Sequence, residues 1–330
     1  MPDRVLSIAG YEIDLGPALY LISSSRIAMV GLQVPEGLKR AAPLIARTVS
    51  DLTGSRVIIS GDPCFGACDL DLDLLTSVDL LLHVGHSELC AAYTDKVVYI
   101  EARMSQPVAD AVQRSIPLLT SPRVGLCTTV QHAQFVPDAL MILAEAGIQA
   151  EAALPGARGK YRGQVLGCNY QAARDLDVDE YLFIGSGLFH PLGMAISTGK
   201  RVVCADPTTG QACEVRPEAL IRRRFGAIAN AMDSRRIAVL VSKKPGQQRQ
   251  ELADFMMEIG TAAGREMIMV RIDNIEPDRL INLGIDAAVS TACPRVALDD
   301  SARYPIPILT PPEFEILLGR KEDYEFDEIV

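Results

Sequence analysis

The sequence repeats one pattern three times, and this repeat constrains the fold more than any other feature. In each copy an apolar strand leads through a polar loop into an amphipathic helix. The three opening strands begin at Arg26, Arg123 and Arg236. The helices that follow are expected over about 36–52, 135–146 and 248–263. Gly147 and Gly264 follow the last two of these helices and predict their ends, because glycine adopts a positive φ without steric cost.

The second half of each copy has an acidic residue, a further apolar strand and then a closing strand. The acidic residues are Asp79, Asp179 and Asp286. The closing strands are expected at 96–101, 201–206 and 306–310. Strands that alternate with helices at this spacing form parallel sheets, since a crossover must return the chain to the start of the next strand.

The repeat therefore predicts an α/β protein of three similar domains, each a small parallel sheet flanked by helices, arranged with pseudo-threefold symmetry. We place the domains at residues 1–121, 122–234 and 235–330, since the boundaries should fall just before the second and third opening strands. The charged segment at 320–328 is expected to be a solvated tail.

One cysteine in each predicted domain lies on a loop just past a strand. Cys68 follows the strand at 56–60, and Cys293 follows the strand that starts at Ala287. Cys168 follows residues 163–167, which we interpret as the corresponding strand of the second copy. Ligand sites in open parallel sheets form beyond the carboxyl ends of the strands, so a pseudo-threefold arrangement would bring the three thiols together. Three convergent thiolates favour an iron–sulfur, zinc or copper site, and three ordinary buried thiols are the alternative.

The other five cysteines have weaker claims. Cys64 shares the loop of Cys68 and could be the ligand instead. Cys127 and Cys204 lie on apolar strands and are expected in the core, while Cys90 and Cys213 lie in helical or loop segments without partners.

Charge and hydropathy restrict the partners. The chain has 32 basic and 42 acidic residues and a formal net charge of −10, which disfavours nucleic acid because phosphate contacts need a basic face. No apolar run approaches the roughly 20 residues that span a bilayer, and the first residues lack a signal peptide's apolar segment. We therefore expect a cytoplasmic protein without membrane contact, in which free cysteines are favoured over disulfides.

Several motifs together resemble one family. GDPCFGACD at 61–69 is preceded by LQVPEGL at 32–38 and followed by HVGHS at 83–87. Further along are GCN at 167–169, GLFHPLG at 187–193, STACPR at 290–295 and TPPE at 310–313. In this order, over nearly the whole chain, they resemble the archaeal enzyme of the first step of diphthamide biosynthesis, 2-(3-amino-3-carboxypropyl)histidine synthase.

The resemblance implies a homodimer of chains with three similar α/β domains. It implies that Cys68, Cys168 and Cys293 hold a [4Fe-4S] cluster whose fourth iron is left for S-adenosylmethionine, and that Cys64 is a bystander. The implied reaction is a non-canonical radical one: S-adenosylmethionine is cleaved reductively, and a 3-amino-3-carboxypropyl fragment is transferred to C2 of a histidine on translation elongation factor 2. An external electron donor is implied as well.

Candidate substrate contacts follow from position. Arg295, two residues after Cys293, could hold the methionine carboxylate, and Gln33 and Glu36 lie where the first strand meets a helix. His86 and His190 end corresponding segments of the first two copies and could contact substrate. Each has a structural alternative, as a solvated arginine, a helix-dipole partner or a hydrogen-bonded histidine. His83 and His132 receive no role.

Two other functions remain open at this stage. A quinolinate synthase-like iron–sulfur dehydratase would also gather one cysteine from each of three domains, although its motifs match less well. A three-lobed small-molecule binding protein, with zinc or without metal, would not need the three cysteines.

Overall fold

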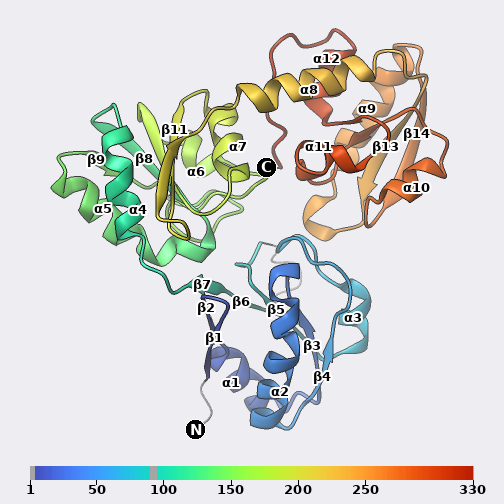
Figure 1. Ribbon diagram of the computed structural model, residues 1–330. Helices are drawn as coiled ribbons and strands as arrows, with labels where there is room; N and C mark the ends of the chain where they lie inside the picture. The colour runs from blue at the N-terminus through green and yellow to red at the C-terminus, as the bar shows by residue number, and fades with distance from the viewer. Residues whose placement is uncertain (1–3, 90–94, 330) are drawn as a thin grey trace.

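The computed structural model describes residues 4–89 and 95–329 and has three lobes, each containing one parallel sheet (Figure 1). The figure shows the three lobes facing a common centre, near which the C-terminus lies. Cys90 lies outside the described residues. No helix in the described part of the chain is long and apolar enough to cross a membrane.

The parallel strands of the three sheets share one order, in which the first strand of each copy lies between the second and the third. The order is β4-β3-β5-β6 in the first lobe, β9-β8-β10-β11 in the second and β14-β13-β15-β16 in the third. The first sheet contains β3 (Met29–Gln33), β4 (Arg56–Ile59), β5 (Leu80–Val84) and β6 (Val97–Ile100). The second contains β8 (Arg123–Thr128), β9 (Gln149–Glu151), β10 (Glu180–Ile184) and β11 (Arg201–Asp206). The third contains β13 (Arg236–Ser242), β14 (Glu266–Ile272), β15 (Ala287–Ser290) and β16 (Ile308–Leu309).

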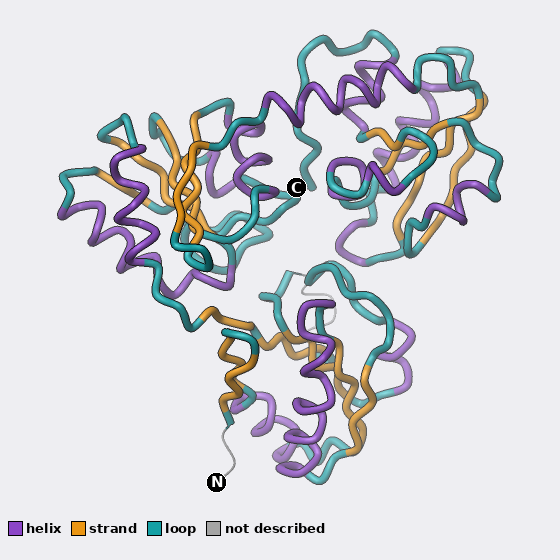
Figure 2. Tube along the Cα trace, viewed as in Figure 1, coloured by secondary structure: helices purple, strands orange, loops and turns teal. Residues whose placement is uncertain are grey.

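The predicted helices are present (Figure 2). Each is preceded by a 3₁₀ turn. The turns are η1 (Glu36–Ala41), η4 (Val130–Phe135) and η5 (Pro245–Gln247), and the helices are α2 (Ala42–Thr53), α5 (Val136–Glu145) and α9 (Gln250–Ala262). Gly147 and Gly264 follow the last two helices with φ of 79° and 77°, as the sequence predicts.

The remaining helices cover the sheets or lead into the loops between strands. They are α1 (Gly16–Ser24), α3 (Leu72–Ser77), α4 (Ala109–Ser115), η3 (Ile116–Leu118), α6 (Gln171–Arg174), α7 (Phe189–Thr198), α8 (Glu218–Asn230), α10 (Pro277–Ile281), α11 (Arg295–Leu298), η6 (Ser301–Arg303) and α12 (Pro311–Leu317).

The repeated acidic residues tie the start of one strand to its neighbour. Asp79 accepts hydrogen bonds from the backbone N–H groups of Ala28 and Met29, at the start of β3. Asp286 accepts from Arg235 and Arg236 in the same way. In the second lobe Asp179 accepts instead from the side chains of Ser121 and Arg123, and Glu180 accepts from the backbone N–H groups of residues 120 and 121, just before β8. The repeated carboxylate therefore satisfies backbone donors at a strand start in the first and third lobes.

Three expectations about strands were wrong or incomplete. Residues 163–167 do not form the strand that corresponds to β4; that strand is β9, and Gln164 and Leu166 make only isolated bridges. Cys213 lies on β12 (Gln211–Glu214), an antiparallel strand added to β11, rather than in a helix or loop. The first lobe also carries an antiparallel sheet of β1 (Val5–Ile8), β2 (Tyr11–Asp14) and β7 (Ala102–Met104).

The cores lie between each sheet and its helices. Cys127 and Cys204 are buried in the second lobe, as predicted. Val112 on α4 packs in one cluster with Val124 of β8, and Ile228 on α8 packs with Ile237 of β13. These two helices therefore join the sheet that follows them in sequence.

Candidate metal centre

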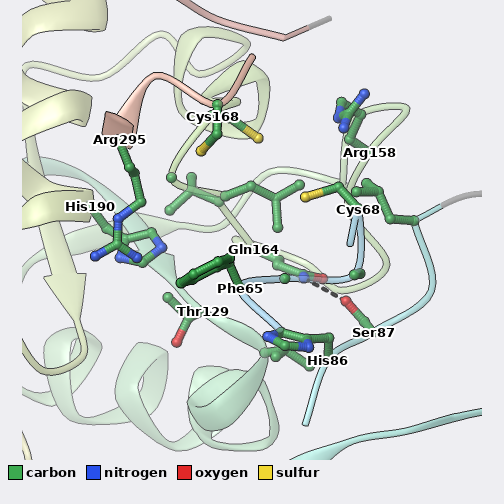
Figure 3. Close-up of a pocket in the computed structure, with 18 of the residues that line it drawn as sticks. Phe65, Cys68, His86, Ser87, Thr129, Arg158, Gln164, Cys168, His190 and Arg295 are labelled. Atoms are coloured by element: carbon green, nitrogen blue, oxygen red, sulfur yellow. Dashed lines mark hydrogen bonds between the residues drawn. The ribbon is translucent and has the colours of Figure 1, made fainter. Parts of the chain in front are cut away.

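Cys68, Cys168 and Cys293 line one cavity of about 230 Å³. Cys68 lies on the loop after β4, Cys168 on the loop before α6, and Cys293 between β15 and α11. Each lobe thus contributes one of these thiols. Figure 3 shows the labelled Cys68 and Cys168 on one side of the cavity and His86 on the other.

The third lobe holds the Cys68 loop through the short segment that contains η5. The side-chain amide of Gln247 donates to the Cys68 sulfur at 3.2 Å, and the backbone N–H of Gly246 donates to the Cys68 carbonyl at 3.3 Å. Arg158 of the second lobe donates to the Gly246 carbonyl at 2.8 Å. The position of Cys68 therefore depends on contacts from both other lobes.

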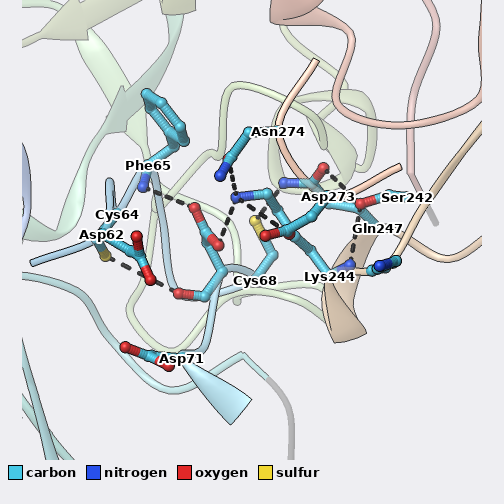
Figure 4. A network of polar contacts seen from close by, with 12 residues as sticks. Asp62, Cys64, Phe65, Cys68, Asp71, Ser242, Lys244, Gln247, Asp273 and Asn274 are labelled. Carbon is cyan, nitrogen blue, oxygen red and sulfur yellow. Dashed lines mark hydrogen bonds and ion pairs between the residues drawn. The ribbon is translucent and has the colours of Figure 1, made fainter. Parts of the chain in front are cut away.

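An ion pair strengthens the same contact (Figure 4). Lys244 Nζ lies 2.6 Å from Asp69 Oδ1, and both side chains are buried. Asp69 also accepts from the backbone N–H of Phe65, while Lys244 donates to Asn274. Burial raises the pKa of Asp69, and the Lys244 ammonium opposes that shift. The pair fixes the residue next to Cys68 against the third lobe.

The C-terminal segment is not the solvated tail that its charge suggested. Phe326, Asp327 and Ile329 are buried, and the backbone N–H of Ile329 donates to the carbonyl of Cys168 at 2.7 Å. Burial is possible because Arg249 compensates the Asp327 carboxylate through two hydrogen bonds of 2.7 Å. The segment packs beside one of the cavity cysteines.

Arg249 also joins this segment to the loop of Cys293. Its Nε donates to the carbonyl of Thr291 at 2.7 Å, and its Nη2 donates to that of Ala292 at 2.9 Å. These are the two residues that precede Cys293. One mostly buried guanidinium thus contacts the Cys293 loop and the segment that packs beside Cys168.

The three thiols influence one another electrostatically. Burial raises the pKa of Cys168 to about 11, and Cys68 contributes to the shift. Burial also raises the pKa of Cys293, with Cys68 and Cys168 as further causes. For Cys68 burial raises the pKa, and the hydrogen bond from Gln247 counteracts it. Three mutually repelling thiolates favour a cation at their centre.

The donors suit an iron–sulfur cluster. The cavity lining contains three thiols, and no carboxylate occurs among its described residues. Thiolates select iron–sulfur, zinc or copper over the hard cations that prefer carboxylates. Arg158 and Arg295 add two guanidinium groups to the lining, which suit the negative charge of a thiolate-bound cluster or of a carboxylate.

Cys64 does not line this cavity. Its thiol is buried, with Sγ 4.0 Å from the carbonyl oxygen of Asp69, and burial raises its pKa to about 12. The geometry favours Cys68 over Cys64 as the member of the convergent set.

Gln33 and Glu36 do not line the cavity. Gln33 is buried and lines a different cavity, and its amide bonds to the backbone of Asp69 and Asp71 and to the ring of His83. Glu36 is exposed at the start of η1, and its carboxylate lies 3.8 Å from Lys39 Nζ. This position matches the structural alternative for Glu36, a partner of the helix dipole. A direct contact of either with substrate stays a prediction.

His86, His190 and Arg295 do line the cavity. The His190 ring stacks on Phe183, and burial lowers its pKa to about 4. Arg295 lies over the Phe189 ring at 4.6 Å and pairs with Asp299 at 2.9 Å. His83, which received no role from the sequence, is fully buried and lies 2.9 Å from His86.

Sequence reasoning missed Arg158, Gln164 and Gln247. Arg158 and Gln164 lie on the loop after β9, whose course was misassigned, and Gln247 lies 179 residues from the sulfur that it contacts. The polar residues that follow β13 were a usable signal, since they lie past a strand end as Cys68 does.

Gly246 provides a test of the contact on Cys68. A Cβ at this position would lie 2.5 Å from the Cys68 Cβ, too close for the loop to stay in place. We expect Gly246→Ala to reduce iron bound per chain after anaerobic reconstitution at least twofold, measured by iron and sulfide analysis. Gly226→Ala, at a helix position with open space, is the matched control and should bind iron as the unmodified chain does. Equal iron in both variants would show that the third-lobe contact does not position Cys68.

Comparisons with known proteins agree with this geometry. The family described as "Putative diphthamide synthesis protein" matches residues 34–330. The chain is 36% identical over 324 residues to 2-(3-amino-3-carboxypropyl)histidine synthase of Pyrococcus horikoshii, covering 97% of this chain and 94% of that protein. It is 27% identical to the enzyme of the same name from Methanocaldococcus jannaschii, over 90% of this chain and 86% of that one.

A solved structure is similar throughout. It is the crystal structure of Dph2 from Pyrococcus horikoshii with a 4Fe-4S cluster, with a TM-score of 0.89 and 34% identity. The similarity covers 99% of this chain and 95% of that chain. The cluster named for that structure agrees with the thiol-lined cavity found here. From the shared motifs, the matching fold and these comparisons, the chain belongs to the diphthamide synthesis protein family.

Proposed function

We propose that the chain is a 2-(3-amino-3-carboxypropyl)histidine synthase, which performs the first step of diphthamide biosynthesis. It transfers the 3-amino-3-carboxypropyl group of S-adenosylmethionine to C2 of a histidine on translation elongation factor 2. The observation that carries the proposal is the convergence of three thiols, one from each lobe, on a cavity whose described lining has no carboxylate. The relatives of the same name support it.

The residues Cys68, Cys168 and Cys293 hold the [4Fe-4S] cluster in this proposal, with one iron left for S-adenosylmethionine. When bound, the cluster supplies the electron that cleaves the bond between the sulfonium and the γ carbon. The protein selects that bond among three C–S bonds by orienting the sulfonium. Gln247 keeps Cys68 in place through its hydrogen bond to sulfur, and Arg249 keeps the loop of Cys293 in place.

Arg295 and Arg158 are the groups best suited to the methionine carboxylate. Arg295 is half-exposed, and its pairing with Asp299 can be exchanged for a bound carboxylate. Nε of Arg158 is buried and has no partner among the described residues, so it is ready to donate. His190, neutral and held between Phe183 and Phe189, adds a polar group on the Arg295 side of the cavity.

The proposed partners are elongation factor 2, a second copy of this chain and an external electron donor, in the cytoplasm. A net charge of −10 favours association with a basic face of a protein substrate and disfavours nucleic acid. The three-domain division at 1–121, 122–234 and 235–330 and the pseudo-threefold arrangement belong to this proposal. The shared strand order supports three such units. Because α4 and α8 pack on the second and third sheets, the proposed boundaries move from 121/122 and 234/235 to positions before these two helices.

The two alternative functions differ in their products and in their need for the thiols. A quinolinate synthase-like dehydratase would not consume S-adenosylmethionine, and a binding protein would not need the three cysteines. Membership in the diphthamide synthesis family favours the transferase.

The test uses the anaerobically reconstituted protein with dithionite, S-adenosylmethionine labelled in its carboxypropyl carbons, and an archaeal elongation factor 2. We expect methylthioadenosine together with label on the factor. A factor whose target histidine is replaced by alanine should take up no label. Absence of methylthioadenosine from a preparation with a full complement of iron and sulfide would overturn the proposal.

A further inference from the structure

The side-chain amide of Gln33 has only one possible orientation. Its Nε2 donates to the carbonyl of Asp69 at 2.9 Å, and its Oε1 accepts from the backbone N–H of Asp71 at 3.3 Å. Backbone groups cannot exchange donor and acceptor roles, so they fix which end of the amide is oxygen. Gln33 therefore presents an acceptor to its next neighbour, the ring of His83.

This orientation determines where both histidine rings carry their hydrogens. His83 Nδ1 lies 2.9 Å from Gln33 Oε1 and must donate, which leaves His83 Nε2 as an acceptor in the neutral ring. His86 Nδ1 lies 2.9 Å from that Nε2 and must donate in turn. Burial keeps both rings neutral: it lowers the pKa of His83, and it lowers that of His86 to about 4. The remaining nitrogen, His86 Nε2, therefore carries a lone pair.

His86, which carries this lone pair on Nε2, lines the same cavity as the three cysteines. No hydrogen bond from the described residues reaches His86 Nε2. Next to it, the hydroxyl of Ser87 accepts from Gln164 at 2.9 Å, and Gln164 is fixed by the backbone N–H groups of Lys160 and Tyr161 (Figure 3). Gln33, acting through His83, and Gln164 therefore determine the donor and acceptor roles of two neighbouring cavity residues, His86 and Ser87.

A metal ion shared by Cys64, His83 and His86 is the competing interpretation, since their ligand atoms lie within 4.8 Å of one another. The two ring nitrogens are 2.9 Å apart, a hydrogen-bond distance. Two nitrogens on one tetrahedral zinc would lie roughly 3.3 Å apart, from bonds of about 2.0–2.1 Å. The chain of hydrogen bonds accounts for the whole arrangement without a metal.

We propose that His86 Nε2 is the proton acceptor for the modified histidine, an inference that rests on the proposed function. The γ carbon of the fragment bonds to C2 of the substrate imidazole, and the C2–H bond must then break to restore the aromatic ring. The proton passes to His86 Nε2, and the one surplus electron passes to the oxidised iron–sulfur cluster, which gave up one electron in cleaving the sulfonium. Gln33 and His83 are positioning residues that keep the lone pair on His86 Nε2.

The activity test compares His86→Gln with the unmodified enzyme, at equal iron and sulfide per chain. We expect methylthioadenosine formation to persist with little change in the half-saturating concentration of S-adenosylmethionine. Transfer to the elongation factor should fall by about 10²- to 10⁴-fold, the usual contribution of a positioned acid or base. His132→Gln replaces a buried neutral histidine outside the cavity lining and should keep the ratio of transfer to cleavage.

Three results of the activity measurements would overturn the proposal. Transfer and cleavage could fall together with a raised half-saturating concentration of S-adenosylmethionine, in which case His86 binds the co-substrate. The ratio of transfer to cleavage could also stay the same in His86→Gln as in the unmodified enzyme, in which case His86 does not accept the proton. If His86→Gln fails to hold iron, two other experiments replace it. With substrate deuterated at C2, we expect a slower transfer step in the unmodified enzyme. Added imidazole should restore transfer in a His86→Ala variant, and failure to restore it counts against the proposal.

A spectroscopic measurement is independent of catalysis. In ¹⁵N-labelled protein without the cluster, the nitrogen shifts of His86 should show Nδ1 protonated and Nε2 unprotonated at pH 7. The opposite tautomer would overturn the proposal even if the enzyme is active. Failure of the proposed function would instead appear as a lack of methylthioadenosine with the predicted tautomer still present, so the two failures are distinguishable.

Discussion

Replacing Cys168 by alanine is expected to lower the iron content from about four atoms per chain to near background. Among the described residues that line the cavity, Cys168 is the one thiol from the second lobe. No other described thiol of that lobe can therefore replace it. Two thiolates hold too few corners of a cubane cluster to retain it. Iron and acid-labile sulfide after anaerobic reconstitution, with the absorbance near 400 nm before and after dithionite, measure the effect.

Cys64→Ala is the matched control for this result. Cys64 is buried and close to Cys68 in sequence but does not line the cavity, so the variant should retain the full iron content and the band that bleaches on reduction. Loss of iron in Cys64→Ala with retention in Cys68→Ala would exchange the roles of the two cysteines. Full iron in Cys168→Ala would show that the three thiols do not form one ligand set.

The repeated part of the fold was predictable because local signals determine it. Apolar strands, helix-ending glycines and a carboxylate before the third strand recur in each copy, and the structure shows why. The carboxylates of Asp79 and Asp286 accept from backbone donors at the start of the neighbouring strand. A local pattern with a structural reason can be read without knowledge of distant contacts.

The misassigned strand shows the limit of that approach. Residues 163–167 contain apolar side chains before Cys168, which suggested a strand, whereas the actual strand β9 is only three residues long. Within this segment only Gln164 pairs with β8, through a single isolated bridge to Thr128, so the segment does not form a strand of the sheet. Short edge strands carry too little periodicity to be distinguished from loops.

The contacts that position the cysteines are long-range and could not be predicted. Gln247 and the Cys68 sulfur are 179 residues apart in sequence and are in contact only because the first and third lobes pack together. The C-terminal segment looked like a solvated tail because its charges are visible in sequence and their partners are not. Asp327 is buried because Arg249 lies opposite, 78 residues away.

Arg249 gives the second large expected effect. Replacement by methionine keeps most of the side-chain volume but leaves the buried Asp327 carboxylate and the carbonyls of Thr291 and Ala292 without their donor. Removing one partner of a buried ion pair costs about 3–5 kcal/mol of the free energy of unfolding. Because these groups flank Cys293 and Cys168, iron binding should fall together with stability.

Urea unfolding of the reconstituted protein and iron analysis measure the two effects of Arg249→Met. Arg236→Met is the matched control: Arg236 pairs with Glu266 at 2.8 Å on the surface, where such pairs contribute about 0–1 kcal/mol.

The double variant Arg249→Met with Asp327→Leu removes the uncompensated carboxylate, so it should recover part of the stability but not the hydrogen bonds to the Cys293 loop. If the double variant regained stability while iron stayed low, the guanidinium would be required to position the cysteine loop. Full iron in Arg249→Met would mean that the loop of Cys293 holds its position without the guanidinium.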